Sequence, residues 1–370
     1  MTLFLISRLR LSFWVLATCF LLSVLCSAIQ AAPAPSGEDA ALQSSPIRNF
    51  SLPTTISPEA QAFLKTRYAS PGKVPPTPRT VEEWKARQER YRQVYGRADL
   101  QKALQQSQAF DIGKQTIADV TVRTIRPATI AAQNQDRVLI QLHGGGYVYG
   151  DDDMTVIGAI PIALRSQIKV ISVDYRMPPE APFPAAVEDV VAVYRELIRH
   201  YPPENIGIFG SSAGGGLTAA VTLAIRDQGL PLPSAVALIT PWSDLSKSGD
   251  SYETLAGLDP VLRSYEAGLA SFATLYAGDS GLKKPLVSPV YGDYRKGFPP
   301  ALLLSGTRDL FLSCTVRLHR KLRQAGQPAE LHVFEGMWHG FHGNNKLPEA
   351  QDALNEIANF FKRHLGQPHS

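Results

Sequence analysis

A serine between two glycines is the residue of this chain best placed to do nucleophilic chemistry. The segment Gly210–Gly214 reads G-S-S-A-G and fits the pattern G-x-S-x-G, in which a serine occupies a tight turn between a strand and a helix. An apolar run over 206–209 precedes it, and small residues that predict a helix over 213–226 follow it. Because such a turn exposes the serine hydroxyl, we interpret Ser212 as a nucleophile and keep Ser211 as its competitor.

An H-G-G-G run that begins at His143 provides backbone donors for the negative charge that such an attack develops. Backbone N–H groups stabilise an oxyanion without reorganising, and glycine lets the backbone approach the reacting atoms. We expect the N–H groups of Gly145 and Gly146 to act with that of Ala213, and Gly144 stays a candidate donor. His143 is expected to organise this loop rather than to react.

A serine hydroxyl attacks only when a base removes its proton, and that base needs a third group that orients it. Two apolar runs typical of strands, 301–305 and 331–334, are each followed by a polar loop. Asp309 lies in the first loop and His339 in the second, in the chain order nucleophile, acid, base. We expect His339 to take the Ser212 proton and Asp309 to hold the imidazole tautomer and stabilise the imidazolium.

Other residues compete for the roles of acid and base. Asp244 lies beyond another predicted strand, and His342 follows His339 by three residues. Asp174 precedes the serine, which is the wrong chain order for the acid. A further polar set is expected to form an ion-pair and turn network rather than a second catalytic centre: Asp174, Arg176, Glu180 and Asp189.

Aromatic residues near these motifs in the sequence are candidates for an apolar substrate pocket. Tyr147 follows the glycine run, Trp242 follows a predicted strand, and Phe341 lies close to His339. Simple core packing is the alternative for all three residues.

The motifs together resemble the hormone-sensitive-lipase-like branch of the α/β-hydrolases, a bacterial family of carboxylesterases with an H-G-G-G motif. The resemblance extends from about residue 120 to about residue 365. It rests on His143–Gly146, Asp174-Tyr175-Arg176, Pro179-Glu180, Phe183-Pro184, Gly210–Gly215, Ser288-Pro289, Gly306–Asp309 and His339-Gly340-Phe341. The chain departs from the family at Ser211, where Asp is usual, and at 311–314, where a second acid is common.

This resemblance implies an α/β fold with a mainly parallel eight-stranded sheet, helices on both faces and a helical cap. It implies hydrolysis of short- to medium-chain carboxylic esters without a cofactor, with an acyl optimum at or below about eight carbons. Hydrolysis of lactones or amides by the same three residues is one alternative. A non-catalytic ligand receptor on the same scaffold, as in the plant gibberellin receptor, is another, although such receptors lose a member of the triad.

Hydrophobic periodicity from residue 117 onward predicts strands that alternate with helices, which indicates a mainly parallel sheet. Val120, Val122 and Ile125 alternate with polar residues and predict an antiparallel edge strand. The remaining strands are expected at 138–142, 170–173, 206–209, 235–240, 301–305 and 330–334. Helices are expected at 58–68, 81–106, 185–201, 213–226, 252–277, 313–325 and 347–364.

These elements predict a catalytic domain over 111–366 that follows a tail over 32–57 and an N-terminal cap segment over 58–110. Residues 252–280 are expected to complete the cap. Because the cap helices show little amphipathic periodicity, we expect them to lie on another body rather than to build a core of their own.

Composition excludes several classes of function. The chain is 44% hydrophobic and 19% charged, which is ordinary for a globular protein. A formal net charge of +4, with no basic run, argues against nucleic-acid binding. Cysteine and histidine show no zinc-site spacing, so we expect no metal and no cofactor. The expected partner is a small ester substrate, and the expected assembly is a monomer or a homodimer.

The N-terminus has the architecture of a secretory signal. Arg8 and Arg10 precede an apolar run over 11–25, and small residues over 27–32 follow it. We therefore expect residues 1–31 to be a signal peptide and the mature protein to be periplasmic or secreted, with no stable membrane span after processing. A retained membrane anchor is the main alternative, but the run is short for a bilayer core of about 30 Å. A lipoprotein is a minor third option.

Export predicts that a precursor is cleaved, so that the mature protein lacks the residues up to about 28–32. The intact mass of the protein recovered from the periplasm or the medium measures this directly. An unprocessed N-terminus embedded in membrane would support the anchor instead.

Overall fold

The computed structural model describes residues 51–95 and 107–367. The predicted signal over 1–31, most of the predicted tail, and the end of the helix predicted over 81–106 lie outside these residues. None of the helices within the described ranges is both long enough and apolar enough to span a membrane.

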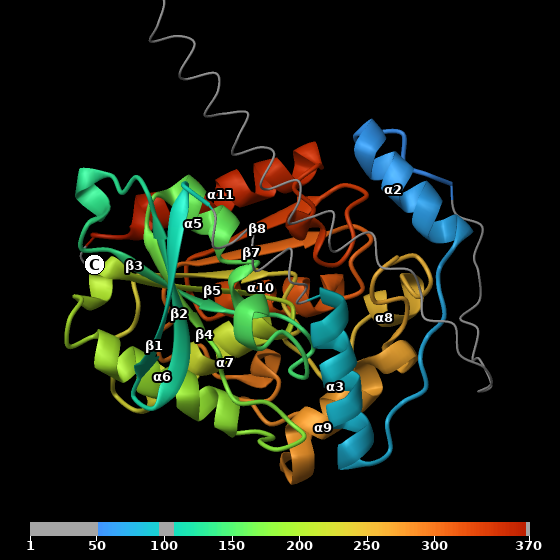
Figure 1. Ribbon diagram of the computed structural model, residues 1–370, viewed down its shortest axis with the longest axis horizontal. Helices are drawn as coiled ribbons and strands as arrows, with labels where there is room; N and C mark the ends of the chain where they lie inside the picture. Colours follow the sequence, from blue (N-terminus) through green and yellow to red (C-terminus); the bar gives the residue numbers. More distant parts are fainter. Residues whose placement is uncertain (1–50, 96–106, 368–370) are drawn as a thin grey trace, which may run out of the picture.

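One eight-stranded sheet forms the centre of the fold, with the strand order β1-β2-β4-β3-β5-β6-β7-β8 (Figure 1). Its strands are β1 (Phe110–Ile117), β2 (Val120–Pro127), β3 (Val138–Leu142), β4 (Lys169–Val173), β5 (Ile206–Ser211), β6 (Ala235–Ile239), β7 (Ala301–Gly306) and β8 (Ala329–Phe334). β2 runs antiparallel to both of its neighbours, and the pairs from β4 to β8 are parallel. The predicted fold class is therefore confirmed.

The prediction of an edge strand at Val120 was wrong, because β2 is the second strand and β1 lies outside it. The two strands pair from Phe110↔Pro127 to Ile117↔Val120 across a tight turn. β1 gave no signal in the sequence because most of its residues are exposed and polar. A strand with little to bury carries no alternating hydrophobic pattern.

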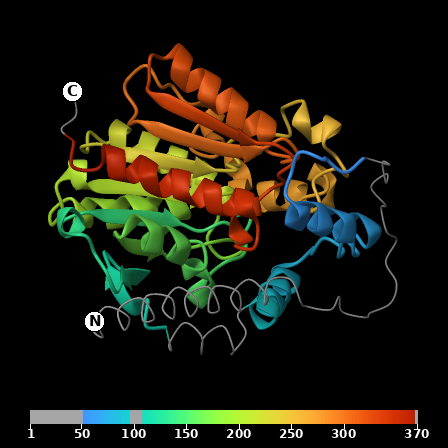
Figure 2. The same cartoon turned by 90° about the horizontal axis from the view of Figure 1, so that it is seen from above.

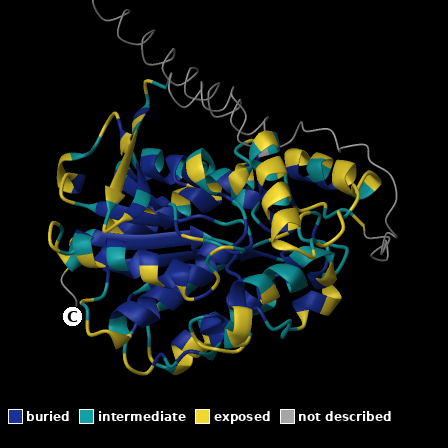
Figure 3. Cartoon of the chain, turned by 60° about the horizontal axis from the view of Figure 1, so that its bottom comes forward, coloured by how far each residue is buried: buried dark blue, intermediate teal, exposed yellow. Residues whose placement is uncertain are grey.

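The sheet carries helices on both faces. The helices are α2 (Pro58–Ala69), α3 (Val81–Tyr95), α5 (Ile160–Ser166), α6 (Ala185–Leu197), α7 (Ala213–Asp227), α8 (Ser251–Thr254), α9 (Ala270–Ala277), α10 (Leu312–Gln324) and α11 (Pro348–His364). One core cluster joins the sheet to α6, α7 and α10, and a second joins it to α5, α11 and α2. Figure 3 shows the central strands buried, while α2 and α3 expose much of their surface. The short α5 was not predicted.

The segments predicted to form a cap gather at one end of the sheet. α2 and α3 lie at the same end as α8 and α9 in both Figure 1 and Figure 2. The helix predicted over 252–277 is divided, since α8 ends at Thr254 and a π-helical turn over Tyr265–Leu269 leads into α9. Gly268 interrupts that turn with φ 151°, a conformation that favours glycine.

Glycines let β3, β5 and α7 approach backbone to backbone beside Ser212. A Cβ added to Gly214 would lie 2.1 Å from the Leu142 carbonyl oxygen, and one on Gly210 would lie 2.3 Å from the Gly214 carbonyl oxygen. These contacts are with backbone, which cannot move aside as a flexible side chain does. The G-x-S-x-G spacing therefore follows from packing between two strands and the helix that begins after the serine.

Gly214→Ala is expected to destabilise the protein by about 1–3 kcal/mol, because the new methyl group overlaps the β3 backbone. Gly113→Ala is the matched control, since a Cβ at this exposed β1 position meets nothing within 4 Å. Urea unfolding of both variants measures the difference. Equal stability of the two variants would contradict the packing argument.

Candidate active site

Ser212 occupies a strained backbone conformation between β5 and α7. Its φ of 58° and ψ of −122° lie outside the regions that non-glycine residues ordinarily adopt, which costs on the order of 1–3 kcal/mol. Two hydrogen bonds to residues outside α7 hold this conformation. The Ser212 N–H donates to the Ile239 carbonyl at 2.9 Å, and the Ser212 carbonyl accepts from the Trp242 N–H at 2.9 Å. The sheet and the loop after β6 thus maintain the strain.

The structure brings the three predicted residues into one chain of hydrogen bonds. His339 Nε2 lies 2.9 Å from Ser212 Oγ, and His339 Nδ1 lies 3.0 Å from Asp309 Oδ1. The side chains come from the loops after β5, β7 and β8, whose carboxyl ends meet at one edge of the sheet. An imidazole between a hydroxyl and a carboxylate is arranged to take the hydroxyl proton.

The Asp309 carboxylate is fully buried and held by hydrogen bonds on both oxygens. Oδ1 accepts from the Phe311 N–H at 2.9 Å, and Oδ2 accepts from Ser305 Oγ at 2.7 Å. The Phe311 ring also stands edge-on to the His339 ring, with their centroids 4.8 Å apart. These contacts leave the carboxylate one orientation toward the imidazole.

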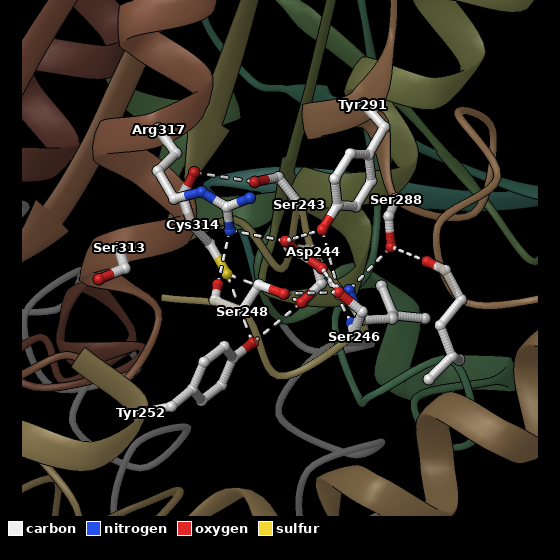
Figure 4. A network of polar contacts seen from close by, with 12 residues as sticks. Ser243, Asp244, Ser246, Ser248, Tyr252, Ser288, Tyr291, Ser313, Cys314 and Arg317 are labelled. Atoms are coloured by element: carbon white, nitrogen blue, oxygen red, sulfur yellow. Dashed lines mark hydrogen bonds and ion pairs between the residues drawn. The ribbon is translucent and has the colours of Figure 1, made fainter. Parts of the chain in front are cut away.

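The rival acids have other partners, and the rival base is a buried, neutral ring. The Asp244 carboxylate accepts from Arg317 at 2.6 Å and from Tyr291 Oη at 2.9 Å, in the network that Figure 4 shows. Asp174 accepts from the Asp152 N–H at 3.3 Å. Burial lowers the pKa of His342 to about 4, which keeps that ring neutral at neutral pH.

The glycine loop, His143–Gly146, lies directly against the serine turn, Gly210–Gly214. A Cβ on Gly144 would lie 3.4 Å from the Ser212 Cβ, and Gly145 and Gly146 have φ of 109° and 65°. Within the residues that the structure describes, the N–H groups of Gly144, Gly145 and Gly146 donate no hydrogen bond. The Ala213 N–H stands at the start of α7, where backbone donors have no partner inside the helix. Free donors of this kind suit a developing oxyanion.

His143 contacts the loop rather than Ser212. Its Nδ1 lies 2.8 Å from the Gly144 carbonyl oxygen, and its ring stacks on Tyr175 with centroids 4.1 Å apart. Tyr175 Oη in turn donates to the His143 carbonyl at 2.7 Å. Burial lowers the pKa of His143 to about 4, so the ring is neutral and its Nδ1–H donates to the carbonyl.

The three aromatic residues expected near a pocket are all buried, which favours their packing alternative. Tyr147 stacks on Tyr276 with centroids 3.7 Å apart. Trp242 is fully enclosed and stacks on Phe311 at 5.3 Å. Phe341 is also enclosed and belongs to the core cluster under α11.

Phe272 of α9, which no sequence motif indicated, lies beside the candidate site. A Cβ on Gly146 would lie 2.7 Å from Phe272 Cδ2, so this half-buried ring covers the glycine loop. Trp84 of α3 and Tyr149 contact the ring edge-on at 5.9 and 5.5 Å. No local pattern marks Phe272, because its role comes from the meeting of α3, α9 and the glycine loop.

α2 braces the loops that carry the acid and the base. Phe63 stacks on Trp338, next to His339, with centroids 4.3 Å apart. Tyr68 Oη accepts from Arg308 Nη1 at 2.8 Å, next to Asp309. Part of the predicted cap segment therefore packs behind the hydrogen-bonded residues.

The predicted ion-pair and turn network is confirmed around Arg176 and Asp189. The Arg176 guanidinium lies 2.7 Å from the Asp189 carboxylate, which also accepts from the Arg176 N–H at 2.8 Å. Glu180 instead pairs with Lys85 of α3 at 3.0 Å. Across the described part of the chain, no group of three or more acidic, histidine or cysteine side chains is arranged to hold a metal ion.

Known proteins are similar to this chain in both sequence and fold. Residues 139–343 match the model of a protein family that is described as having the alpha/beta hydrolase fold. An acetyl-hydrolase of Streptomyces hygroscopicus is 35% identical over 67% of this chain and 81% of its own length. An esterase of Acinetobacter venetianus is 31% identical over 66% of this chain and 81% of its own length.

Solved structures of esterases have a closely similar backbone. One esterase structure superposes with a TM-score of 0.78 and 36% identity, covering 88% of this chain and 99% of that chain. An esterase from the bacterial hormone-sensitive lipase family superposes with a TM-score of 0.72 and 32% identity, covering 84% of this chain and 99% of that chain. The chain thus belongs to the hormone-sensitive-lipase-like carboxylesterases of the α/β-hydrolase fold.

Proposed function

We propose that this protein is a serine carboxylesterase that hydrolyses short- to medium-chain esters through an acyl-enzyme intermediate. The observation that carries the proposal is the hydrogen-bond chain from Ser212 Oγ through the His339 ring to the buried Asp309 carboxylate. The relatives named acetyl-hydrolase and esterase support an ester with a small acyl group.

In the acylation half of the reaction, Ser212 Oγ attacks the ester carbonyl carbon while His339 Nε2 takes its proton. The carbonyl oxygen becomes negatively charged and accepts hydrogen bonds from the free N–H groups of the glycine loop and of Ala213. Asp309 stabilises the imidazolium that forms. The intermediate collapses when the C–O bond to the alcohol breaks, and His339 gives its proton to the leaving oxygen.

Deacylation repeats these steps with water as the nucleophile. His339 takes a proton from water, the hydroxide adds to the acyl carbon, and the proton returns to Ser212 Oγ as the acid leaves. No metal or organic cofactor enters this scheme. Lactones and amides would use the same residues, and the names of the relatives favour esters over both.

Ser212→Ala is expected to abolish esterase activity and to leave the fold unchanged, because alanine removes only the attacking oxygen. Triad deletions in a serine protease lower kcat by about 10⁶, and a loss approaching that size is expected here. Hydrolysis of 4-nitrophenyl acetate measures the loss, and circular dichroism checks the fold.

Ser211→Ala is the matched control, since it removes a hydroxyl one position earlier in the same turn. A serine-directed phosphonate should label the parent protein and Ser211→Ala, but not Ser212→Ala. Labelling of Ser211 in the parent would assign the nucleophile to that residue instead.

We propose further that α3 and α9 belong to a cap that limits the acyl length. The Phe272 ring lies over Gly146, and Trp84 packs against that ring from α3. An aromatic wall beside the glycine loop leaves room for a short acyl chain and stops a longer one. Each CH₂ that still fits contributes about 0.8 kcal/mol, or roughly four-fold in kcat/KM.

Phe272→Ala is therefore expected to move the acyl optimum from at or below about eight carbons toward longer chains. A series of 4-nitrophenyl esters from two to sixteen carbons measures the optimum. Phe298→Ala is the control. This buried phenylalanine comes before β7, at the end of the strand that points away from the candidate site, and it packs on Tyr294. An unchanged optimum in Phe272→Ala would contradict the proposed wall.

A further inference from the structure

Asp259 is a second buried carboxylate beside the proposed triad. It lies in the turns between α8 and the π-helical turn that begins at Tyr265, and its side chain is fully buried. Among the residues that the structure describes, no arginine, lysine or histidine forms an ion pair with it. Four backbone N–H groups are its hydrogen-bond donors. A buried carboxylate without a cation calls for an explanation, since isolated buried charge is costly.

The two oxygens of this carboxylate have different partners. Oδ1 accepts from the N–H groups of Val261 and Leu262 at 2.8 and 3.1 Å, which closes a local turn. Oδ2 reaches outside that turn. It accepts from the Leu310 N–H at 2.9 Å and from the His339 N–H at 3.4 Å.

Oδ2 thereby connects the loops of the acid and the base. Leu310 follows Asp309 directly, so one oxygen contacts the backbone beside the acid and the backbone of the histidine itself. Neither bond is needed to form the turn at Val261, which Oδ1 already closes. The second oxygen instead ties the two loops to each other. Their relative position determines whether Asp309 and His339 lie within hydrogen-bond distance.

The charge of Asp259 also acts on the same pair of residues. Burial, with a smaller contribution from the Asp309 charge, raises the pKa of Asp259 to about 6, while His339 and the backbone donors oppose this rise. The carboxylate is therefore ionised in the neutral to alkaline range. Tyr68 also faces this region, with Arg308 bound to its hydroxyl, and His342 lies near His339.

We propose that Asp259 is a positioning residue for ester hydrolysis. It holds the loop of Asp309 and the loop of His339 in a fixed relative position, and its negative charge stabilises the imidazolium formed at His339. This inference rests on the proposed function, because it assumes that His339 is the base. When His339 takes the Ser212 proton, its positive charge lies near two buried carboxylates rather than one. Low dielectric surroundings strengthen that attraction.

Asp244 offers a matched comparison because it is equally buried and lies in another loop at the carboxyl edge of the sheet. Its charge is paired with Arg317 and its oxygens accept from Tyr291 and Ser246, as Figure 4 shows. Asp244 makes no hydrogen bond to the loops of Asp309 or His339 among the described contacts. A general effect of removing a buried carboxylate would therefore appear in variants of both residues.

The test is Asp259→Asn in the full chain, assayed with 4-nitrophenyl acetate from about pH 5 to pH 10. Asparagine keeps the size of the side chain and the oxygen that closes the turn, but removes the charge. We expect kcat to fall by about ten- to one-hundred-fold with KM nearly unchanged, because the base is displaced from the hydroxyl. We also expect the acid limb of the kcat/KM profile to move to lower pH, by on the order of one unit, because the imidazolium loses a stabilising charge.

Asp244→Asn is the control and should lower the melting temperature while leaving the acid limb in place. Asp259→Glu keeps the charge, so it should lower kcat but hold the acid limb near its parent position. If Asp259→Asn does not fold, Asp259→Glu still tests the proposed role of Asp259, because a moved acid limb in this variant would contradict it. An unmoved acid limb in folded Asp259→Asn, a moved one in Asp259→Glu, or an equal movement in Asp244→Asn would overturn the proposal.

Phosphonate labelling separates failure of this inference from failure of the proposed function. Asp259→Asn should still be labelled at Ser212, more slowly than the parent. If no serine of the parent is labelled, the proposed function is wrong, and if Ser211 is labelled, the choice of nucleophile is wrong. If Ser212 is labelled and the Asp259 variants behave as the parent does, only the role of Asp259 is wrong.

Discussion

The close contact of β3, β5 and α7 at the serine turn is the constraint on which the rest of the site depends. A backbone carbonyl of β3 occupies the place that a side chain at Gly214 would need, so helix and sheet meet without intervening side chains. That contact, with the bonds from Ser212 to Ile239 and Trp242, holds an unfavourable backbone conformation. The strain is maintained because most of the surrounding core would have to move to relieve it.

The parallel arrangement of the strands brings the acid and the base to the strained serine. β5, β7 and β8 end at the same edge, so their following loops converge although Ser212, Asp309 and His339 are far apart in the chain. Loops are individually soft, and hydrogen-bond geometry tolerates little displacement. The acid and base loops are accordingly tied from several sides, by Ser305 within the sheet, by α2 behind them, and by the Asp259 carboxylate between them.

Segments outside the sheet have two different physical roles. α2 contributes buried residues to the core under α11 and stacks Phe63 on Trp338, so it supports the loops behind the site. α3 and α9 instead meet over the glycine loop, where Trp84 and Phe272 form an aromatic wall. Neighbouring helices of one chain segment thus make different contacts, α2 with the loops behind the site and α3 with Phe272 of α9.

The fold class, most strand and helix positions, and the chain order of Ser212, Asp309 and His339 could be predicted from the amino-acid sequence. This was possible because turns, apolar runs and helix periodicity depend on residues that are close in the chain. Four features could not be predicted and depend on the three-dimensional packing: β1 lies at the edge, Phe272 covers Gly146, Trp242 is enclosed, and Asp259 reaches two distant loops. Such contacts join residues far apart in the chain. They leave no periodic pattern, because each depends on how whole elements pack rather than on any neighbouring residue.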